Sequence, residues 1–336
     1  MKFGETFTEF LHGDQEWFLD KCSHVEYKRL KKVLKACQVC RALRDSSSDE
    51  QVENNEGDES NISPRNYQLD TCPECDEKFF SELSKEASDI AGCFRSRVRR
   101  LLHFHISNGL QKYMWRLRLC FSDDQQTLVE EGRMLLDYVT VNATAIRKIL
   151  KKYDKVHGSV SGRNFKMVMR AKRIELLQSP WLIELGAFYL SRSDAGEPGE
   201  FFRKFSCDLS GSQPLMTMVV SDSITYEYSL TCAICLDTLF NPYALGCGHL
   251  FCKGCACSAA SVLIYEGPKS APQGAKCPVC REVGVYPDST HMIELDHLLR
   301  NRCKEYWTER LREERAEMVK QAKQYWERQT LAAVGY

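Results

Sequence analysis

Residues 231–281 read TCAICLDTLFNPYALGCGHLFCKGCACSAASVLIYEGPKSAPQGAKCPVCR, and cysteine recurs in this stretch in closely spaced pairs. These spacings let two side chains turn back onto one tetrahedral ion, which is the geometry of structural zinc. The eight candidate ligands, in chain order, are Cys232, Cys235, Cys247, His249, Cys252, Cys255, Cys277 and Cys280. Because about fifty residues provide little hydrophobic core, two zinc ions would supply much of the folding free energy of this segment.

The order of these ligands resembles the C3HC4 pattern of the RING family, in which histidine is the fourth ligand; relatives with C4HC3 order place it fifth. The resemblance implies a small α+β finger with two interleaved zinc sites. One zinc would be held by Cys232, Cys235, Cys252 and Cys255, and the other by Cys247, His249, Cys277 and Cys280. A zinc scaffold without ligase activity remains the alternative.

In the RING family, an aliphatic residue between the first two cysteines and a proline between the last two help to form the groove for a ubiquitin-conjugating enzyme (E2). Ile234 and Pro278 occupy these positions, and Arg281 stands where the family often has an arginine that bridges E2 and ubiquitin. A guanidinium can donate to several carbonyls at once and so hold the thioester ready for attack. Residues 262–264 replace a tryptophan that many RINGs have, and we expect Cys257 to be a structural thiol.

The length of 336 residues favours a protein of two domains. The 46 basic residues balance 46 acidic ones. Zero net charge and the absence of aromatic residues interleaved with basic ones near the zinc ligands count against a nucleic-acid partner. The chain has no apolar run of the length that spans a bilayer and no apolar core of a secretory signal. We therefore expect an intracellular, soluble protein whose 17 cysteines are metal ligands or buried thiols rather than disulfides.

Outside the cysteine-rich stretch, apolar residues recur at helical spacing, which predicts a mainly α fold. We expect long helices around 80–101 and 128–153, because apolar residues there recur every three or four positions. We also expect a short helix at 6–11, a longer one at 16–42 and two shorter ones at 165–177 and 180–189. Residues 45–70 are expected to be a flexible acidic insertion. The predicted domains are a helical bundle at 1–192, a linker at 193–230, the zinc finger at 231–281 and a helical tail at 282–336.

Four lysines of the second long helix fall on one face, at i, i+3, i+4 and i+7: Lys148, Lys151, Lys152 and Lys155. Apolar residues repeat the same spacing on the far side of this helix. Like charges at this spacing destabilise a helix by about 0.2–0.5 kcal/mol per pair. The stripe is therefore either a solvated face that serves solubility or a binding surface for an anion.

Three segments near the N-terminus, MKFG (1–4), EW (16–17) and YKRLKK (27–32), resemble the start of an SPX domain. That resemblance covers about residues 1–190 and implies an N-terminal helical hairpin joined to a bundle of two long helices. It also implies a basic surface that binds inositol polyphosphates and pyrophosphates as regulatory ligands. The residues that match the phosphate-contacting positions are Lys2, Tyr27, Lys31, Lys148, Lys151, Lys152 and Lys155.

An SPX domain followed by a C3HC4 RING and a C-terminal helix is similar to the plant nitrogen-limitation-adaptation family of ubiquitin ligases. The resemblance implies an E3 ubiquitin transferase whose partners are an E2, ubiquitin and substrate proteins, namely phosphate transporters of the plasma membrane. It thus implies a role in phosphate and nitrogen homeostasis and a cytoplasmic protein recruited to that membrane, with the nucleus as an alternative. A homodimer and a non-catalytic SPX adaptor or signalling scaffold also remain open.

A third zinc site is a further hypothesis. Two more cysteine pairs, Cys37-x2-Cys40 and Cys72-Pro-Glu-Cys75, flank the acidic insertion, and the second pair has the same form as the one at 277–280. If the flanking helices pack antiparallel, the two pairs would lie close enough to complete a four-cysteine site. The alternative is that these cysteines are free thiols at helix ends.

Overall fold

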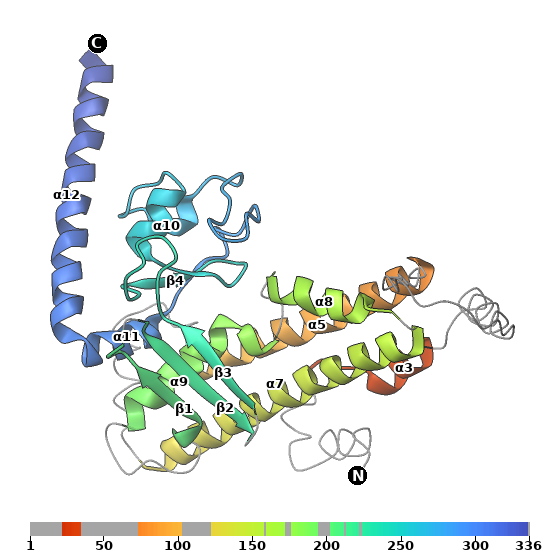
Figure 1. The fold of residues 1–336 in the computed structure, drawn as a ribbon. Coiled ribbons are helices and arrows are strands. Elements are labelled where there is room, and N and C mark those ends of the chain that lie inside the picture. Colours follow the sequence, from red (N-terminus) through yellow and green to blue (C-terminus); the bar gives the residue numbers. More distant parts are fainter. Residues whose placement is uncertain are drawn as a thin grey trace, which may run out of the picture. The chain divides into compact units, whose positions relative to one another are not determined.

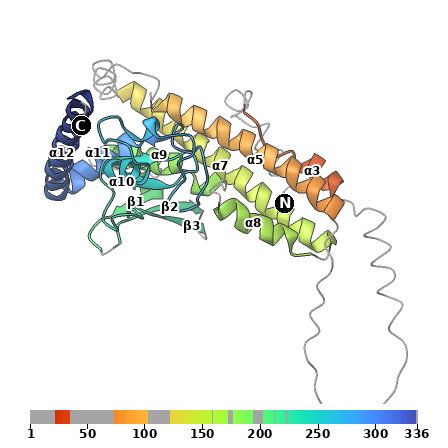
Figure 2. The ribbon, with the colours of Figure 1, turned by 90° about the horizontal axis from the view of Figure 1, so that it is seen from above.

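The structure, a computed structural model, describes residues 22–34, 73–102, 122–157, 159–171, 176–193, 202–211, 213–221 and 224–334. The described residues form two compact units. The first comprises those up to residue 93 together with 138–170, and the second comprises 94–137 together with 171–334. Figures 1 and 2 show the helices and strands of each unit.

The first unit is helical. It contains α3 (Tyr27–Val33), α8 (Ser161–Ala171) and parts of α5 (Pro73–Leu101) and α7 (Ser122–His157). Helix α5 begins with a proline at its first position and acids in its first turn, and it ends with two arginines, as the helix dipole favours. In this unit, α5 and α7 lie side by side (Figures 1 and 2), and the rings of Phe79 and Tyr153 stack with centroids 4.5 Å apart.

Both long helices were predicted from their apolar spacing, and the apolar residues at this spacing are buried, with the exception of Phe80. The buried residues are Leu83, Ala87, Ile90, Phe94, Val98 and Leu101 of α5 and Leu128, Leu135, Tyr138, Ile146, Ile149 and Tyr153 of α7. Phe80, predicted with the first set, is only half-buried and stacks on Phe165 of α8, at 4.7 Å between centroids. These observations confirm a mainly α fold.

The segment that leads into α3 is tied to both long helices. The buried amide of Asn142 accepts a hydrogen bond from Val25 N at 2.9 Å and donates one to the carbonyl of Tyr138. Next to this contact, Cys22 forms a disulfide with Cys93 of α5, with a Cα–Cα distance of 5.8 Å. Our expectation that no cysteine is disulfide-bonded is wrong for this pair, because the fold brings the two positions within bonding distance although they are 71 residues apart.

The second unit corrects the prediction of a linker at 193–230. Residues of this segment form an antiparallel sheet in the order β1-β2-β3, with β1 at Phe205–Asp208, β2 at Leu215–Ser221 and β3 at Ile224–Ser229. The sheet packs on α9 (Pro180–Ser193), where a Cβ added to Gly186 would lie 2.8 Å from the ring of Phe205. Figure 1 shows α9 against the strands. Two short 3-10 helices, η1 (Leu176–Gln178) and η2 (Phe202–Lys204), flank α9.

The cysteine-rich stretch belongs to the same unit and has the expected α+β form. A small antiparallel sheet has the order β5-β4-β6, with β4 at Pro242–Ala244, β5 at Leu250–Cys252 and β6 at Thr290–His291. Helix α10 (Lys253–Ala259) follows β5, and η3 (Pro268–Ser270) lies in the long connection to the last ligand pair. The tail is helical, as predicted, and forms α11 (Ile293–Arg302) and α12 (Lys304–Val334).

Several predictions fall outside the described residues: the helix at 6–11, most of the helix at 16–42, the acidic insertion at 45–70, Lys2, and three cysteines of the hypothetical third zinc site, Cys37, Cys40 and Cys72. Of that site, only Cys75 is described, half-buried in the first turn of α5. In the part of the chain that the structure describes, no helix is both long and apolar enough to cross a membrane.

Candidate metal centre

The first and last ligand pairs adopt the same local fold. In each, the amide after the second cysteine donates to the carbonyl of the first, from Leu236 to Cys232 and from Arg281 to Cys277, both at 2.9 Å. This turn needs a left-handed residue after the second cysteine, and Leu236 and Arg281 have φ angles of 64° and 61°. The first cysteine of each pair then donates its own amide to a carbonyl further along, which closes the loop. The backbone thus presents both sulfurs of a pair toward one point.

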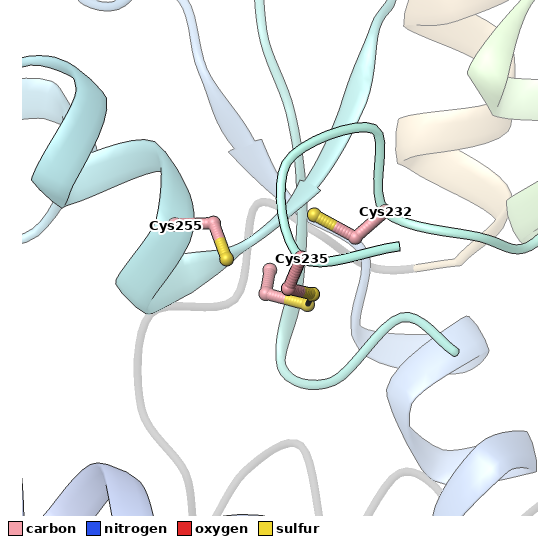
Figure 3. A group of neighbouring side chains, drawn as sticks. Cys232, Cys235 and Cys255 are labelled. Atoms are coloured by element: carbon pink, nitrogen blue, oxygen red, sulfur yellow. Dashed lines mark hydrogen bonds between the residues drawn. The ribbon is translucent and has the colours of Figure 1, made fainter. Parts of the chain in front are cut away.

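The first cluster consists of the side chains of Cys232, Cys235, Cys252 and Cys255, whose sulfurs all lie within 4.8 Å of one another. Figure 3 shows that Cys232 and Cys235 come from one loop, whereas Cys255 reaches across from a helix, which is α10. The sulfurs of Cys235 and Cys252 are 3.8 Å apart. Cys252 also accepts a hydrogen bond from the Phe240 amide at 3.3 Å, the kind of bond that stabilises a thiolate.

The second cluster joins Cys247, His249, Cys277 and Cys280, again with all ligand atoms within 4.8 Å. Nδ1 of His249 is 3.4 Å from the sulfur of Cys247 and 3.6 Å from that of Cys277. The residue between the first two ligands is Gly248, at a φ angle of 84°, which few other residues adopt. Its conformation lets Leu245 donate back to the carbonyl of His249 at 2.9 Å.

The sulfurs of each cluster lie close enough to shift one another's pKa in opposite directions. Hydrogen bonds from Cys252 and Cys255 lower the pKa of Cys232, whereas donating to Cys232 raises the pKa of Cys252. In the second cluster, a hydrogen bond from Cys247 lowers the pKa of Cys277 to about 3, and the pKa of Cys247 is raised in return. A cation could replace the thiol protons in each cluster. Four thiolates, or three thiolates and an imidazole, are donor sets that fit zinc.

The predicted E2-contact residues are on the surface. Ile234 is 40% exposed between the first two ligands, and Pro278 and Arg281 are exposed at the last pair. Of the residues that replace the family tryptophan, Ile264 is buried, and its amide donates to Oε1 of Gln321 in α12. Cys257 is fully buried, and burial raises its pKa to about 11, as expected for an unreactive structural thiol.

Helix α12 contributes contacts to this centre that the sequence analysis missed. Tyr306 donates to the carbonyl of Thr238 at 2.5 Å, and Glu314 accepts from the side-chain amide of Asn241 at 3.0 Å. Of the apolar tail residues, Leu295, Leu298 and Leu299 of α11 are buried. Trp326 of α12 is instead 67% exposed. No sequence pattern indicates the contacts of Tyr306 and Glu314, because both are polar residues in a helix rich in charged ones.

The predicted basic cluster lies in the first unit. Lys148, Lys151 and Lys155 are exposed on α7, and Lys152 is half-buried. Burial lowers the pKa of Lys152, and the positive charge of Lys31 on α3 lowers it further. Tyr27, at the start of α3, is half-buried. The fold therefore brings lysines of two helices, more than a hundred residues apart in sequence, within reach of each other's charge.

Comparison with known proteins identifies the family. Residues 232–280 match the zinc finger, C3HC4 type (RING finger). Over its whole length the chain is 61% identical to the probable E3 ubiquitin-protein ligase BAH1-like 1 of Oryza sativa subsp. indica, and 100% of that protein is covered. The chain belongs to this family of E3 ubiquitin-protein ligases. It is also 58% identical to an Arabidopsis thaliana BAH1-like ligase and 40% identical to the E3 ubiquitin-protein ligase NLA of that plant, with full coverage of both.

These relatives and the RING finger make the chain a RING-type E3 ubiquitin transferase, with an E2 and ubiquitin as its partners. This result decides against the non-catalytic adaptor or scaffold. No solved structure matches the chain.

Proposed function

We propose that the chain couples ubiquitin transfer to the level of phosphorylated inositols, which an SPX-type domain at residues 1–192 senses. In this proposal the bundle binds an inositol polyphosphate or pyrophosphate and recruits substrates. Phosphate transporters of the plasma membrane are the proposed targets, which gives the ligase a role in phosphate and nitrogen homeostasis. The RING at residues 231–281 then promotes transfer of ubiquitin from the E2 to substrate lysines.

The observation that carries the sensing proposal is the proximity of Lys31 to Lys152. Two ammonium groups on neighbouring helices repel each other, and burial of Lys152 adds to the cost of its charge. A ligand with several phosphates would offset both penalties, because its negative charges would attract the lysines of both helices. The exposed Lys148, Lys151 and Lys155 would extend the site along α7. The hydroxyl of Tyr27 and the ammonium of Lys2 are proposed to complete it.

The zinc sites serve the transfer step by holding the surface that meets the E2. We assign one zinc to Cys232, Cys235, Cys252 and Cys255, and the other to Cys247, His249, Cys277 and Cys280. When bound, each zinc would cross-link two ligand pairs that are distant in sequence and so stabilise the finger. The exposed Ile234 and Pro278 are proposed to contact the E2, and Arg281 to donate hydrogen bonds that orient the E2-bound ubiquitin.

Calorimetry with inositol hexakisphosphate tests the sensing site. Replacing the four α7 lysines together by alanine (Lys148, Lys151, Lys152 and Lys155) should weaken binding at least about a hundredfold, because several charge-assisted bonds are lost. A matched control replaces four exposed lysines of the second unit: Lys269, Lys276, Lys320 and Lys323. The control should bind like the unchanged protein. If both quadruple variants bind with equal affinity, the α7 lysines do not form the binding site and serve solubility instead.

A further inference from the structure

One face of α12 packs along the zinc finger, although the residues that match the RING family end at 280. The residues of α12 that touch the finger recur at helical spacing, so they lie on one face. They are Tyr306, Trp307, Glu314 and Gln321. Through this face, α12 contacts the metal centre.

Most of these contacts fall on the four residues 238–241. Tyr306 holds the carbonyl of Thr238, Trp307 packs against the ring of Phe240 at 5.5 Å between centroids, and Glu314 holds the side chain of Asn241. Asn241 itself has a left-handed backbone, with a φ angle of 46°. This short loop matters to the metal centre because the amide of Phe240 donates to the sulfur of Cys252. The helix therefore fixes a hydrogen bond to a candidate zinc ligand.

Arg310 lies between these anchoring residues on the same face. Its side chain is only 26% exposed, and one terminal nitrogen pairs with Glu313 at 2.9 Å. Its Nε is buried and has no hydrogen-bond partner. Burial works against the charge of Arg310, but its pKa is nevertheless raised because Tyr306, Cys252 and Cys235 lie close by. Arg310 lies one helical turn from both Tyr306 and Glu314, so this partly buried cation faces the 238–241 loop, whose Phe240 amide donates to Cys252.

The two zinc sites would differ in charge. A zinc ion with four thiolates has a formal charge of −2, whereas one with three thiolates and a neutral imidazole has −1. An anionic centre away from bulk water is destabilised unless hydrogen bonds or cations compensate it. The Phe240 amide provides one hydrogen bond, and Arg310, which lies between the two residues of α12 that bind the 238–241 loop, is the cation that this helix brings to the same side of the cluster.

We propose that Arg310 is a positioning residue of the four-cysteine zinc site, and that the functional RING unit extends through α12 to Gln321. Its charge offsets the excess negative charge of that site, and its helix holds the 238–241 loop so that Phe240 can donate to Cys252. The inference rests on zinc in the two clusters and is independent of the proposed inositol phosphate site. It predicts that a change in α12 alters metal retention at one zinc site only.

Cobalt(II) provides a readout that separates the two sites, because its visible absorption differs between four-sulfur and three-sulfur, one-nitrogen coordination. The full chain is loaded with cobalt, and loss of each absorption band to excess chelator is followed over time. Arg310→Met should speed release from the four-cysteine site at least about tenfold, in line with changes to groups that support metal ligands elsewhere. Release from the Cys247, His249, Cys277 and Cys280 site should be unchanged.

Two controls isolate the charge. Arg310→Lys should retain much of the wild-type lifetime, and Arg312→Met, at an exposed position of the same helix, should release cobalt like the wild type. Tyr306→Phe removes only the donor to Thr238 and should give a smaller acceleration at the same site, so it tests the loop contact even if Arg310→Met fails to fold. Wild-type release by Arg310→Met, or equal acceleration at both sites, would overturn the proposal. A chain that binds no cobalt would refute the zinc assignment itself.

Discussion

Glu184 joins α9 to α11, the helix that follows the RING, within the second unit, and its removal should destabilise that unit. The side chain is fully buried on α9, yet its two carboxylate oxygens accept hydrogen bonds from α11. Glu294 N donates at 2.6 Å and Leu295 N at 3.1 Å. Helix α11 has no side-chain cap of its own at Met292, so Glu184 satisfies amides that a helix start otherwise leaves unpaired.

The magnitude follows from these two bonds. A hydrogen bond to a charged acceptor contributes about 1.5–3 kcal/mol, and a carboxylate at a helix N-terminus adds a favourable interaction with the helix dipole. Glu184→Ala would lose both bonds and leave two buried donors, although water entering the space can satisfy part of their need. We expect the free energy of unfolding of the second unit to fall by about 3 kcal/mol. Glu184→Gln, which retains one acceptor oxygen, should lose roughly half as much.

Hydrogen–deuterium exchange of the α11 amides measures this loss locally. A change of about 3 kcal/mol corresponds to roughly a hundredfold lower protection of Glu294 and Leu295. Glu227→Ala, an exposed glutamate on β3, serves as the control and should alter protection less than about threefold. If Glu184→Ala retains wild-type protection in α11, the carboxylate does not anchor that helix and the reasoning fails.

Three further predictions concern the finger and the cysteines. Arg281→Ala should slow discharge of ubiquitin from the E2 at least about tenfold, with both metals retained; an unchanged rate would remove Arg281 from the transfer step. Cys257, whose pKa is raised to about 11, should resist iodoacetamide at pH 8 in the folded, zinc-loaded chain and react only after unfolding. Labelling of Cys257 in the folded chain at the rate of an exposed thiol would contradict its burial. If the third zinc site exists, metal analysis should give about three zinc ions per chain and two after Cys72→Ser, whereas two in both proteins would exclude it.

The sequence was most informative where partners are close in the chain. Ligands two residues apart bind one metal by local geometry, so the pairs at 232–235 and 277–280 predict their turns without knowledge of the fold. The apolar spacing of α5 and α7 similarly predicts which side of each helix is buried, because helical periodicity alone fixes the face.

The sheet at 205–229 was missed because its signal is short. In β2, buried Met216 and Met218 alternate with more exposed Thr217 and Val219, but the flanking glycine, proline and serine residues resemble a linker. Glu184 was also missed, since a buried acid gives no periodic signal and its partners lie 110 residues further along the chain. Contacts of this kind are set by tertiary packing and cannot be predicted from a single sequence.

Ubiquitin transfer with and without a phosphorylated inositol tests the central claim most directly. The purified chain, an E2 loaded with ubiquitin and free lysine are combined, and discharge is followed at zero and saturating inositol hexakisphosphate. We predict that discharge, or ubiquitination of a bound substrate, changes several-fold with the ligand in the unchanged protein. The variant lacking Lys148, Lys151, Lys152 and Lys155 should show the ligand-free rate throughout. Rates that are identical with and without saturating ligand, for both discharge and substrate ubiquitination, would contradict the account.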